Sequence, residues 1–287
     1  MNNKENAGGF LCTDEERLLI SRATELSVRQ ENSAVALSFL TPREQRLVYE
    51  AMVAGHRADR LFFWGGYYGA ERRRALFLPS WIEAEKACRE MLFSREREEF
   101  FVSLLSEYGM EALLSEYTHV LKLSGSGYAA LEHRDYLGAL MALGIKRSVL
   151  GDICVEGDSA TVFCDERASA FVASELRSAG RDTVRCEIAE AGLDFCPVRQ
   201  FEKICSTVAS PRLDGIVRAL CSVSRDEALR LVNQGMVEVN YFVMKEPDRT
   251  VSPGDIVSVR GHGKYIVDSA CDATRRGRLR LLARKYV

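Results

Sequence analysis

Apolar residues recur along the chain in two patterns, which together predict a mixed α+β protein. Helical spacing of apolar positions marks three N-terminal segments: residues 13–26, 41–55 and 81–116. The first two open with a capping box, in which a threonine is followed three residues later by a glutamate. Two short apolar runs, 61–64 and 75–78, predict a pair of strands. We therefore expect residues 1–116 to form a helical N-terminal domain with a small β-hairpin.

Residues 117–195 alternate between strand-like and helix-like segments. Strands are expected at 119–123, 152–155, 160–164 and 183–188, and helices at 134–143 and 167–179. Gly144 and Gly180 follow the two helices, where a left-handed C-cap is common. The order β-α-β-β-α-β is that of a ferredoxin-like domain and resembles an RNA-recognition motif. The expected strands lack the aromatic-rich motif with which that fold stacks bases, so we expect no base stacking on this sheet.

The C-terminal part, residues 205–287, predicts two short helices followed by strands. Ser210 is a suitable N-cap, with Pro211 at the first helical position. Ser224 with Glu227 is a capping box for the second helix, and Gly235 suits its left-handed C-cap. Strands are expected at 237–243 and 256–259, with a turn at 252–255 between them. This order predicts a small αα-β domain.

The formal charge of the 287-residue chain is −2, but it is unevenly divided. Residues 211–287 contain 14 Lys and Arg against 9 Asp and Glu, whereas the remainder contains 25 against 32. A basic module on an acidic body is the expected charge distribution of a protein that binds nucleic acid through one end. An ordinary mixed surface is the alternative.

Other features of the composition exclude several classes of protein. No window approaches the length of apolar sequence that spans a membrane, and the first residues carry no signal-peptide pattern, so we expect a cytoplasmic protein. The nine cysteines form no C-x-x-C pair and the four histidines are scattered. We therefore expect reduced thiols, no metal site and no cofactor.

The segment between the two N-terminal strands, residues 65–74, is rich in glycine, tyrosine and arginine. Its glycines permit close approach of the backbone to a ligand, its tyrosines can stack on bases, and its arginines can contact phosphates. The residues of this second expected RNA contact are Tyr67, Tyr68, Arg72, Arg73 and Arg74. The alternative is a long turn whose tyrosines cover the edge of the core.

The C-terminal part carries a set of residues that recur in a fixed order in a known family. They are Arg212-Leu213-Asp214, Ser224-Arg225, Ala228, Gly235, Val237, Val239-Asn240, Gly254-Asp255 and Arg260-Gly261. This pattern resembles the RNA-binding domain named after ribosomal protein S-four. In such a domain the second helix directs its first N–H groups toward a phosphate, where the helix dipole favours negative charge. The alternative for Arg212 and Asp214 is a local salt bridge, which we expect for Asp214.

The residues expected to contact RNA lie at the helix starts, in the turns and on the last strands of this domain. They are Arg212, Ser224, Arg225, Asn240, Lys245, Arg260, Gly261, His262, Lys264, Tyr265, Arg275, Arg276 and Arg278. Arg212 and Arg225 are the principal candidates, because most protein contacts to phosphate come from arginine and lysine. Arg278-Leu279-Arg280-Leu281 also fits an ordinary strand with one face exposed to water.

A second resemblance extends over the rest of the chain. Residues 131–140 and 143–153 resemble the central domain of YlmH-type proteins, and Gly65-Gly66-Tyr67 with Ala70-Glu71-Arg72 resembles their N-terminal domain. This resemblance implies rescue of stalled large ribosomal subunits, with peptidyl-tRNA held during C-terminal tailing. The partners it implies are ribosomal RNA and/or tRNA, the large ribosomal subunit and quality-control factors, without a membrane or a small-molecule substrate. The family's naming context also implies a link to cell division.

Catalytic interpretations are weaker. His133-Arg134-Asp135 are adjacent on a helix and do not face one another, so a role at the helix start is favoured. Gly125-Ser126-Gly127 lacks the rest of a nucleotide-binding loop and predicts a turn. Arg212-Leu213-Asp214 echoes pseudouridine synthases, but too little chain follows for their catalytic domain. We expect no enzyme; the alternatives are an RNA-modifying or RNA-processing enzyme with its active site in the central domain, and a protein adaptor for septum assembly.

Overall fold

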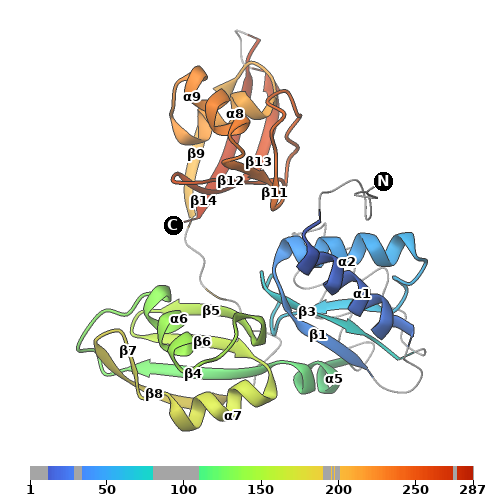
Figure 1. Cartoon of the computed structure of the whole chain (residues 1–287). Coiled ribbons are helices and arrows are strands. Elements are labelled where there is room, and N and C mark those ends of the chain that lie inside the picture. The colour runs from blue at the N-terminus through green and yellow to red at the C-terminus, as the bar shows by residue number, and fades with distance from the viewer. Residues whose placement is uncertain are drawn as a thin grey trace. The chain divides into compact units, whose positions relative to one another are not determined.

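The structure, a computed structural model of the chain, describes residues 12–28, 34–79, 110–189, 195, 197, 201–273 and 277–286. The chain divides into two compact units, Met1–Pro197 and Val198–Val287, and each is described by itself (Figure 1). Helices and antiparallel sheets occur in both units, which confirms the predicted α+β class. Within the described ranges, no helix combines the length and the apolar character needed to span a membrane.

The N-terminal part of the first unit contains two helices and a three-stranded antiparallel sheet. Its elements are α1 (Asp14–Val28), β1 (Val35–Leu40), α2 (Pro42–Ala54), β2 (Leu61–Trp64) and β3 (Arg73–Phe77). The strand order is β1-β3-β2, so the predicted pairing of β2 with β3 is confirmed. The strand β1 was not predicted. Its residues lie directly before the capping box of α2, and the strand is recognisable through its pairing with β3.

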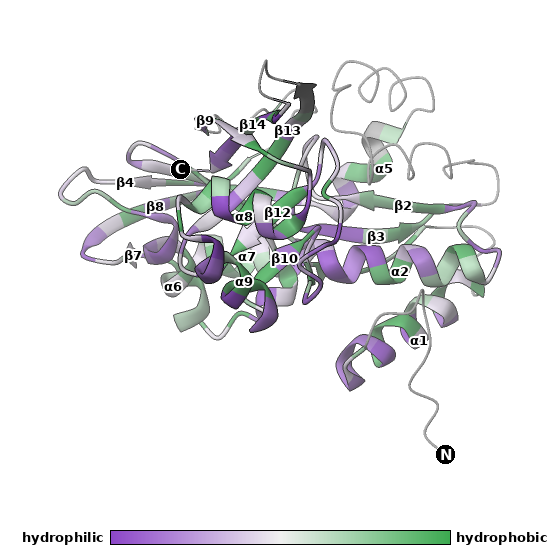
Figure 2. Ribbon diagram, turned by 90° about the horizontal axis from the view of Figure 1, so that it is seen from above, coloured by the Kyte–Doolittle hydropathy of each residue, from purple (hydrophilic) through white to green (hydrophobic). Residues whose placement is uncertain are grey.

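The predicted capping box of α2 is present. The Glu44 N–H donates to the Thr41 hydroxyl (3.3 Å), and the Thr41 N–H donates to the Glu44 carboxylate (2.6 Å). Hydrophobic and hydrophilic stretches alternate along α2 in Figure 2. Helix α5 (Met110–Tyr117) is the described part of the predicted helical segment 81–116; residues 80–109 lie outside the described residues. Leu114 of α5 packs in one cluster with apolar residues of β2 and β3.

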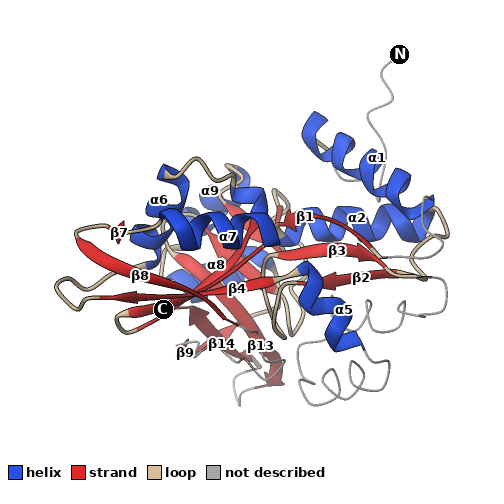
Figure 3. Ribbon diagram, turned by 90° about the horizontal axis from the view of Figure 1, so that it is seen from below, coloured by secondary structure: helices blue, strands red, loops and turns tan. Residues whose placement is uncertain are grey.

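The second part of the first unit has the predicted β-α-β-β-α-β order with one added short strand, β7, before the last strand. Its elements are β4 (His119–Gly125), α6 (His133–Ala142), the 3-10 turn η1 (Arg147–Val149), β5 (Leu150–Glu156), β6 (Ser159–Cys164), α7 (Glu166–Glu175), β7 (Ser178–Ala179) and β8 (Asp182–Ala189). The sheet order is β5-β6-β4-β8-β7, and all neighbours are antiparallel. Residues of α6 and α7 share one apolar cluster with β4, so both helices cover the same face of the sheet (Figure 3).

The end of α7 differs from the prediction. A helix was expected as far as residue 179, with Gly180 as its C-cap, but α7 ends at Glu175. Ser178 and Ala179 instead form β7, which pairs with the start of β8. Gly180 has a φ of +55° in the turn between these two strands, so the glycine serves a hairpin. A local glycine signal is the same for either structure, and strand pairing decides between them.

The second unit is a six-stranded antiparallel sheet with two helices. Its elements are β9 (Phe201–Val208), α8 (Leu213–Cys221), α9 (Arg225–Asn233), β10 (Val237–Val239), β11 (Phe242–Val243), β12 (Ile256–Val259), β13 (Gly263–Ala273) and β14 (Leu279–Tyr286). The order is β11-β10-β12-β13-β14-β9. The strand β9 begins before the predicted domain start at residue 205 and pairs with β14 from Phe201↔Tyr286 to Val208↔Leu279. Its charged and polar residues gave no strand signal.

The first unit is joined internally by the carboxylate of Asp152 on β5. Its Oδ2 accepts hydrogen bonds from the Tyr67 hydroxyl (2.8 Å) and from the N–H of Glu71 (2.7 Å), and its Oδ1 accepts one from the N–H of Arg72 (3.0 Å). The Arg72 guanidinium donates in turn to the carbonyl oxygen of Leu150 (3.0 Å). The segment between β2 and β3 is thereby fixed to the sheet of β4–β8.

Replacing Asp152 by alanine should destabilise the first unit. It leaves three donors without their acceptor, and we expect the free energy of unfolding to fall by about 2–4 kcal/mol. Tryptophan fluorescence during urea unfolding reports on this unit alone, because both tryptophans of the chain, Trp64 and Trp81, lie in it. The exposed Glu175→Ala is the control and should change stability by less than about 0.5 kcal/mol. Equal midpoints for the two variants would contradict the role of Asp152.

Candidate nucleic-acid interface

The first helix of the C-terminal unit does not offer its N-terminus to a ligand. Helix α8 begins at Leu213, and its N-cap is Arg212 rather than the predicted Ser210. The N–H groups of Leu213 and Asp214 donate to the carbonyl oxygens of Arg249 (2.8 Å) and Pro247 (3.0 Å). The chain segment before β12 thus satisfies the donors that a phosphate would otherwise accept from.

Arg212 and Asp214 form the local ion pair expected for the carboxylate. The Arg212 Nε lies 3.2 Å from the Asp214 Oδ1. The Asp214 side chain is 8% exposed and that of Arg212 is 48% exposed, so the arginine neutralises a nearly buried charge while it still reaches the surface. Arg212 therefore supports the fold, whether or not it also contacts RNA.

The start of the second helix is different. The Ser224 hydroxyl accepts a hydrogen bond from the Glu227 N–H (3.1 Å), as predicted for the N-cap of α9. The Glu227 carboxylate, however, pairs with Arg230 (2.7 Å) and does not complete the capping box. Arg225 is exposed, and in the described part of the chain it has no ion pair. Gly235 follows the helix with a φ of +70°, as predicted.

Asn240 was expected to contact RNA, and the structure gives its side chain a role within the fold. Asn240 and Tyr241 have φ values of 51° and 69° and form the two-residue turn between β10 and β11. The Asn240 amide nitrogen donates to Asp255 (2.8 Å), and its amide oxygen accepts from the Ile256 N–H (3.0 Å). The side chain thus joins the turn to the start of β12 and is engaged within the fold.

Tyr265, also expected to contact RNA, has its side chain inside the fold. Its side chain is buried, with the residue only 2% exposed, and its hydroxyl donates to the carbonyl oxygen of His262 (3.0 Å). Burial raises the pKa of this phenol well above its usual range. A base cannot stack on a ring inside the core, so the Tyr265 side chain orders the turn between β12 and β13.

The other expected residues of this unit lie in three places. Lys245, Arg260 and Gly261 are exposed, and His262 is half-buried. Lys264 lies on β13, with its ammonium 5.0 Å from the ring centroid of Tyr241. The Arg278 guanidinium donates to the carbonyl oxygen of Thr207 (2.8 Å). Arg275 and Arg276 lie outside the described residues.

The glycine-rich segment of the first unit is not an exposed basic tip. Tyr67 is 2% exposed and packs on Phe163, and Tyr68 packs beside the cluster that contains Trp64. The guanidiniums of the segment's three arginines donate to backbone carbonyl oxygens. Arg72 donates to Leu150, Phe39 and Arg147. Arg73 donates to Ala70, and Arg74 donates to Leu37 and Tyr117. Burial lowers the pKa of Arg72 and of Arg74. These contacts favour the alternative, a turn that covers the core, and the expected RNA contact of this segment stays a prediction.

The segments weighed for catalysis have structural roles. The Asp135 carboxylate accepts a hydrogen bond from the Glu132 N–H (2.8 Å) at the start of α6, as expected for a helix-start residue. Burial and the nearby Arg147 lower the pKa of His133. The turn at residues 125–127 is held by the Asp182 carboxylate, which accepts hydrogen bonds from the Ser126 hydroxyl and from the Gly127 N–H (3.1 Å). Among the described residues, no three potential metal ligands gather in one place.

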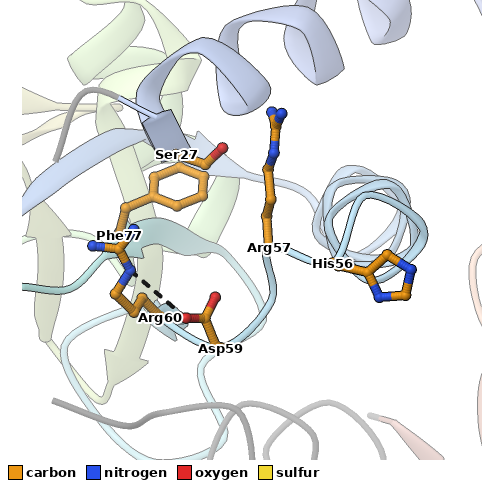
Figure 4. Close-up of a pocket in the computed structure, with 6 residues that line it drawn as sticks. All are labelled: Ser27, His56, Arg57, Asp59, Arg60 and Phe77. Carbon is orange, nitrogen blue, oxygen red and sulfur yellow. Dashed lines mark ion pairs between the residues drawn. The ribbon is translucent and has the colours of Figure 1, made fainter. Parts of the chain in front are cut away.

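A cavity of about 220 Å³ lies in the N-terminal part (Figure 4). It is lined by Ser27, His56, Arg57, Asp59, Arg60 and Phe77. Figure 4 shows Arg60 directed toward Asp59, at an N–O distance of 3.8 Å. The Ser27 hydroxyl donates to the Thr24 carbonyl oxygen (2.7 Å), so this serine is not paired with a base as a nucleophile would be.

The role of Asn240 can be tested by comparing two substitutions. Asn240→Ala loses both amide hydrogen bonds and strains the left-handed backbone, so we expect β10 and β12 to lose about 2–3 kcal/mol of stability. Asn240→Gly keeps the turn conformation and should lose about 1–2 kcal/mol. Amide hydrogen exchange of residues 237–259 measures both. If neither variant exchanges faster than the parent, the side chain does not hold the turn.

Three comparisons relate this chain to known proteins. A family model described as "Putative RNA-binding domain in YlmH" matches residues 120–191. The chain is 30% identical over 269 residues to "Ribosome-associated protein quality control protein P2" of Bacillus subtilis strain 168, covering 93% of this chain and 94% of that protein. The solved structure "Cell division protein ylmH from Streptococcus pneumoniae" superposes with a TM-score of 0.41 at 16% identity, over 62% of this chain and 93% of that one. From its identity to a relative matched over nearly its whole length, the chain belongs to the YlmH family.

Proposed function

We propose that this protein binds structured ribosomal RNA or tRNA at the ribosome and acts in the rescue of stalled large subunits. The full-length similarity to a ribosome-associated quality-control protein supports this role. The C-terminal unit, with its two helices and its excess of basic residues, is the proposed RNA-binding module of the S-four type. The protein acts by binding, without a cofactor and without catalysis of its own.

The observation that carries this proposal is the start of α9. Arg225 is the first helical residue and is exposed, and it makes no ion pair with any described residue. The Ser224 hydroxyl accepts a hydrogen bond from the Glu227 N–H, and the Ser224 carbonyl oxygen accepts one from the Ala228 N–H. Among the described residues, no other segment caps the N–H groups of Arg225 and Asp226, in contrast to those at the start of α8. A phosphate here would meet both a guanidinium and the positive end of a helix dipole.

The proposed contact surface consists of side chains at helix starts and in exposed turns. Its members are Arg212, Ser224, Arg225, Lys245, Arg260, Gly261 and His262. Gly261, with a φ of +83°, provides a turn in which no side chain obstructs the approach of a ligand. The large ribosomal subunit and quality-control factors are the proposed partners in the cytoplasm.

The sharpest test of the site is Arg225→Ala. Folding should change by less than about 0.5 kcal/mol, because the arginine lies at the surface. Binding to large subunits or tRNA should weaken by about 1.5–3 kcal/mol, the value of a hydrogen bond that involves a charged group. Arg230→Ala is the matched control, since it removes the same charge from the same helix, where Glu227 already pairs with it. Arg212→Ala is less suitable because it also leaves Asp214 without its partner. If both α9 variants bind as tightly as the parent, the phosphate site is wrong.

The affinity should also depend steeply on salt. Each phosphate contact contributes a slope of roughly −0.7 to −0.9 to the logarithm of affinity against the logarithm of salt concentration. Several contacts from the basic unit therefore predict a slope of about −2 or steeper. Titrations of labelled tRNA from low to physiological salt measure the slope, and an affinity that does not change with salt is incompatible with this mode of binding.

A further inference from the structure

One face of the C-terminal sheet is directed away from its helices. Tyr265 contacts Cys221 at the end of α8 and pairs in register with Lys285, so Lys285 and the alternate residues of β14 lie on the helix face. Two of these, Leu281 and Ala283, are buried. The intervening residues of β14 lie on the opposite face: Arg280, Leu282, Arg284 and Tyr286. Leu282, Arg284 and Tyr286 are half-buried, and Arg280 is exposed.

Aromatic rings and cations alternate across this opposite face. The Tyr286 ring lies 5.0 Å from that of Phe201, over which the Arg284 guanidinium lies at 5.1 Å. On the other side of Tyr286 the Lys264 ammonium lies 4.9 Å from its centroid, and it is also within contact of the Tyr241 ring. We call this surface the aromatic–basic face; its members are Tyr241, Lys264, Tyr286, Phe201, Arg284, Lys203 and Arg280.

The charge of this face is positive. Lys203 lies opposite Arg284 in the pairing of β9 with β14, and Arg280 lies four residues before Arg284 on the same side. Arg284 is paired with Asp268 (2.7 Å), and Glu238 is in the same row as Lys264. Lys203 and Arg280 are exposed, and neither has an ion pair with a residue of this unit whose side chain the structure describes; Asp272 lies opposite Arg280 in the pairing of β13 with β14.

These features fit a single-stranded nucleic acid better than a protein. Surfaces that bind single strands combine aromatic rings, on which bases stack, with cations along the backbone path. A nucleic acid brings a phosphate for each cation and releases counterions. An apolar protein surface would have to desolvate these cations without compensation. We infer that the aromatic–basic face binds single-stranded RNA by base stacking and phosphate contact, separately from the helix starts. This inference rests on the proposed RNA-binding function of the unit.

The test uses the full chain with two probes, short labelled oligouridine and a labelled RNA stem-loop. Tyr286→Leu should weaken oligouridine binding by about fivefold or more, the effect of losing one stacked base, whereas Tyr286→Phe keeps the ring and should stay within about twofold. The double variant Lys203→Gln/Arg280→Gln should reduce the salt slope by about 1.4. Lys285→Gln is the matched control, because it removes one charge from β14 on the helix face, and it should change oligouridine affinity by less than about twofold.

The outcomes separate this inference from the proposed function. If oligouridine binding is unchanged in Tyr286→Leu and in the double variant, while Arg225→Ala weakens stem-loop binding, the inference is wrong and the proposed function stands. If none of these variants affects either probe, both are wrong. If the face variants keep their RNA affinity but lose association with large subunits, the face binds a protein and the inference is wrong. If Tyr286→Leu does not fold, the double variant and its control decide.

Discussion

The carboxylate of Asp152 holds the polar segment between β2 and β3 in place within the first unit. By accepting hydrogen bonds from Tyr67, Glu71 and Arg72, it fixes the segment between β2 and β3 on the neighbouring sheet. The three arginines of that segment donate hydrogen bonds to backbone carbonyl oxygens, so a stretch that is basic in sequence connects two parts of the first unit. An excess of positive formal charge is found instead in residues 211–287, which hold 14 Lys and Arg against 9 Asp and Glu.

Some motif residues of the C-terminal unit stabilise its fold, and others lie exposed at its surface. Asn240 and Tyr265 hold turns, and the donors at the start of α8 are satisfied by backbone. Arg225 and Arg260 reach the surface. Membership of a sequence motif therefore indicates where a residue lies, and burial together with hydrogen bonding indicates what it does there. The helix starts and the opposite sheet face offer different chemistry: point contacts to phosphate on one side, and rings flanked by cations on the other.

The sequence predicts the local features of this protein well, because their causes are local. Ser224 and Gly235 bound α9 as expected, and Thr41 caps α2. Features that depend on distant partners could not be predicted in the same way. The strand β9 is recognisable through its pairing with β14. Tyr67 is buried with its hydroxyl donating a hydrogen bond to Asp152, which lies 85 residues away in the sequence. In the candidate site the exposed Arg225 follows from its place at a helix start. The hydrogen bond from Asn240 to Asp255 could not be predicted, because it depends on the conformation of the turn that brings the two side chains together.

We propose that the C-terminal unit makes the principal contact with RNA, in preference to residues 120–191, which match the model of a putative RNA-binding domain. The most direct measurement is ultraviolet crosslinking of the full-length protein to RNA in cells, followed by mass spectrometry of the crosslinked peptides. The account predicts crosslinks within residues 201–286, at the start of α9 and on the turns and strands that follow. Crosslinks confined to residues 119–189 or to the segment 65–74, with none in the C-terminal unit, would contradict it.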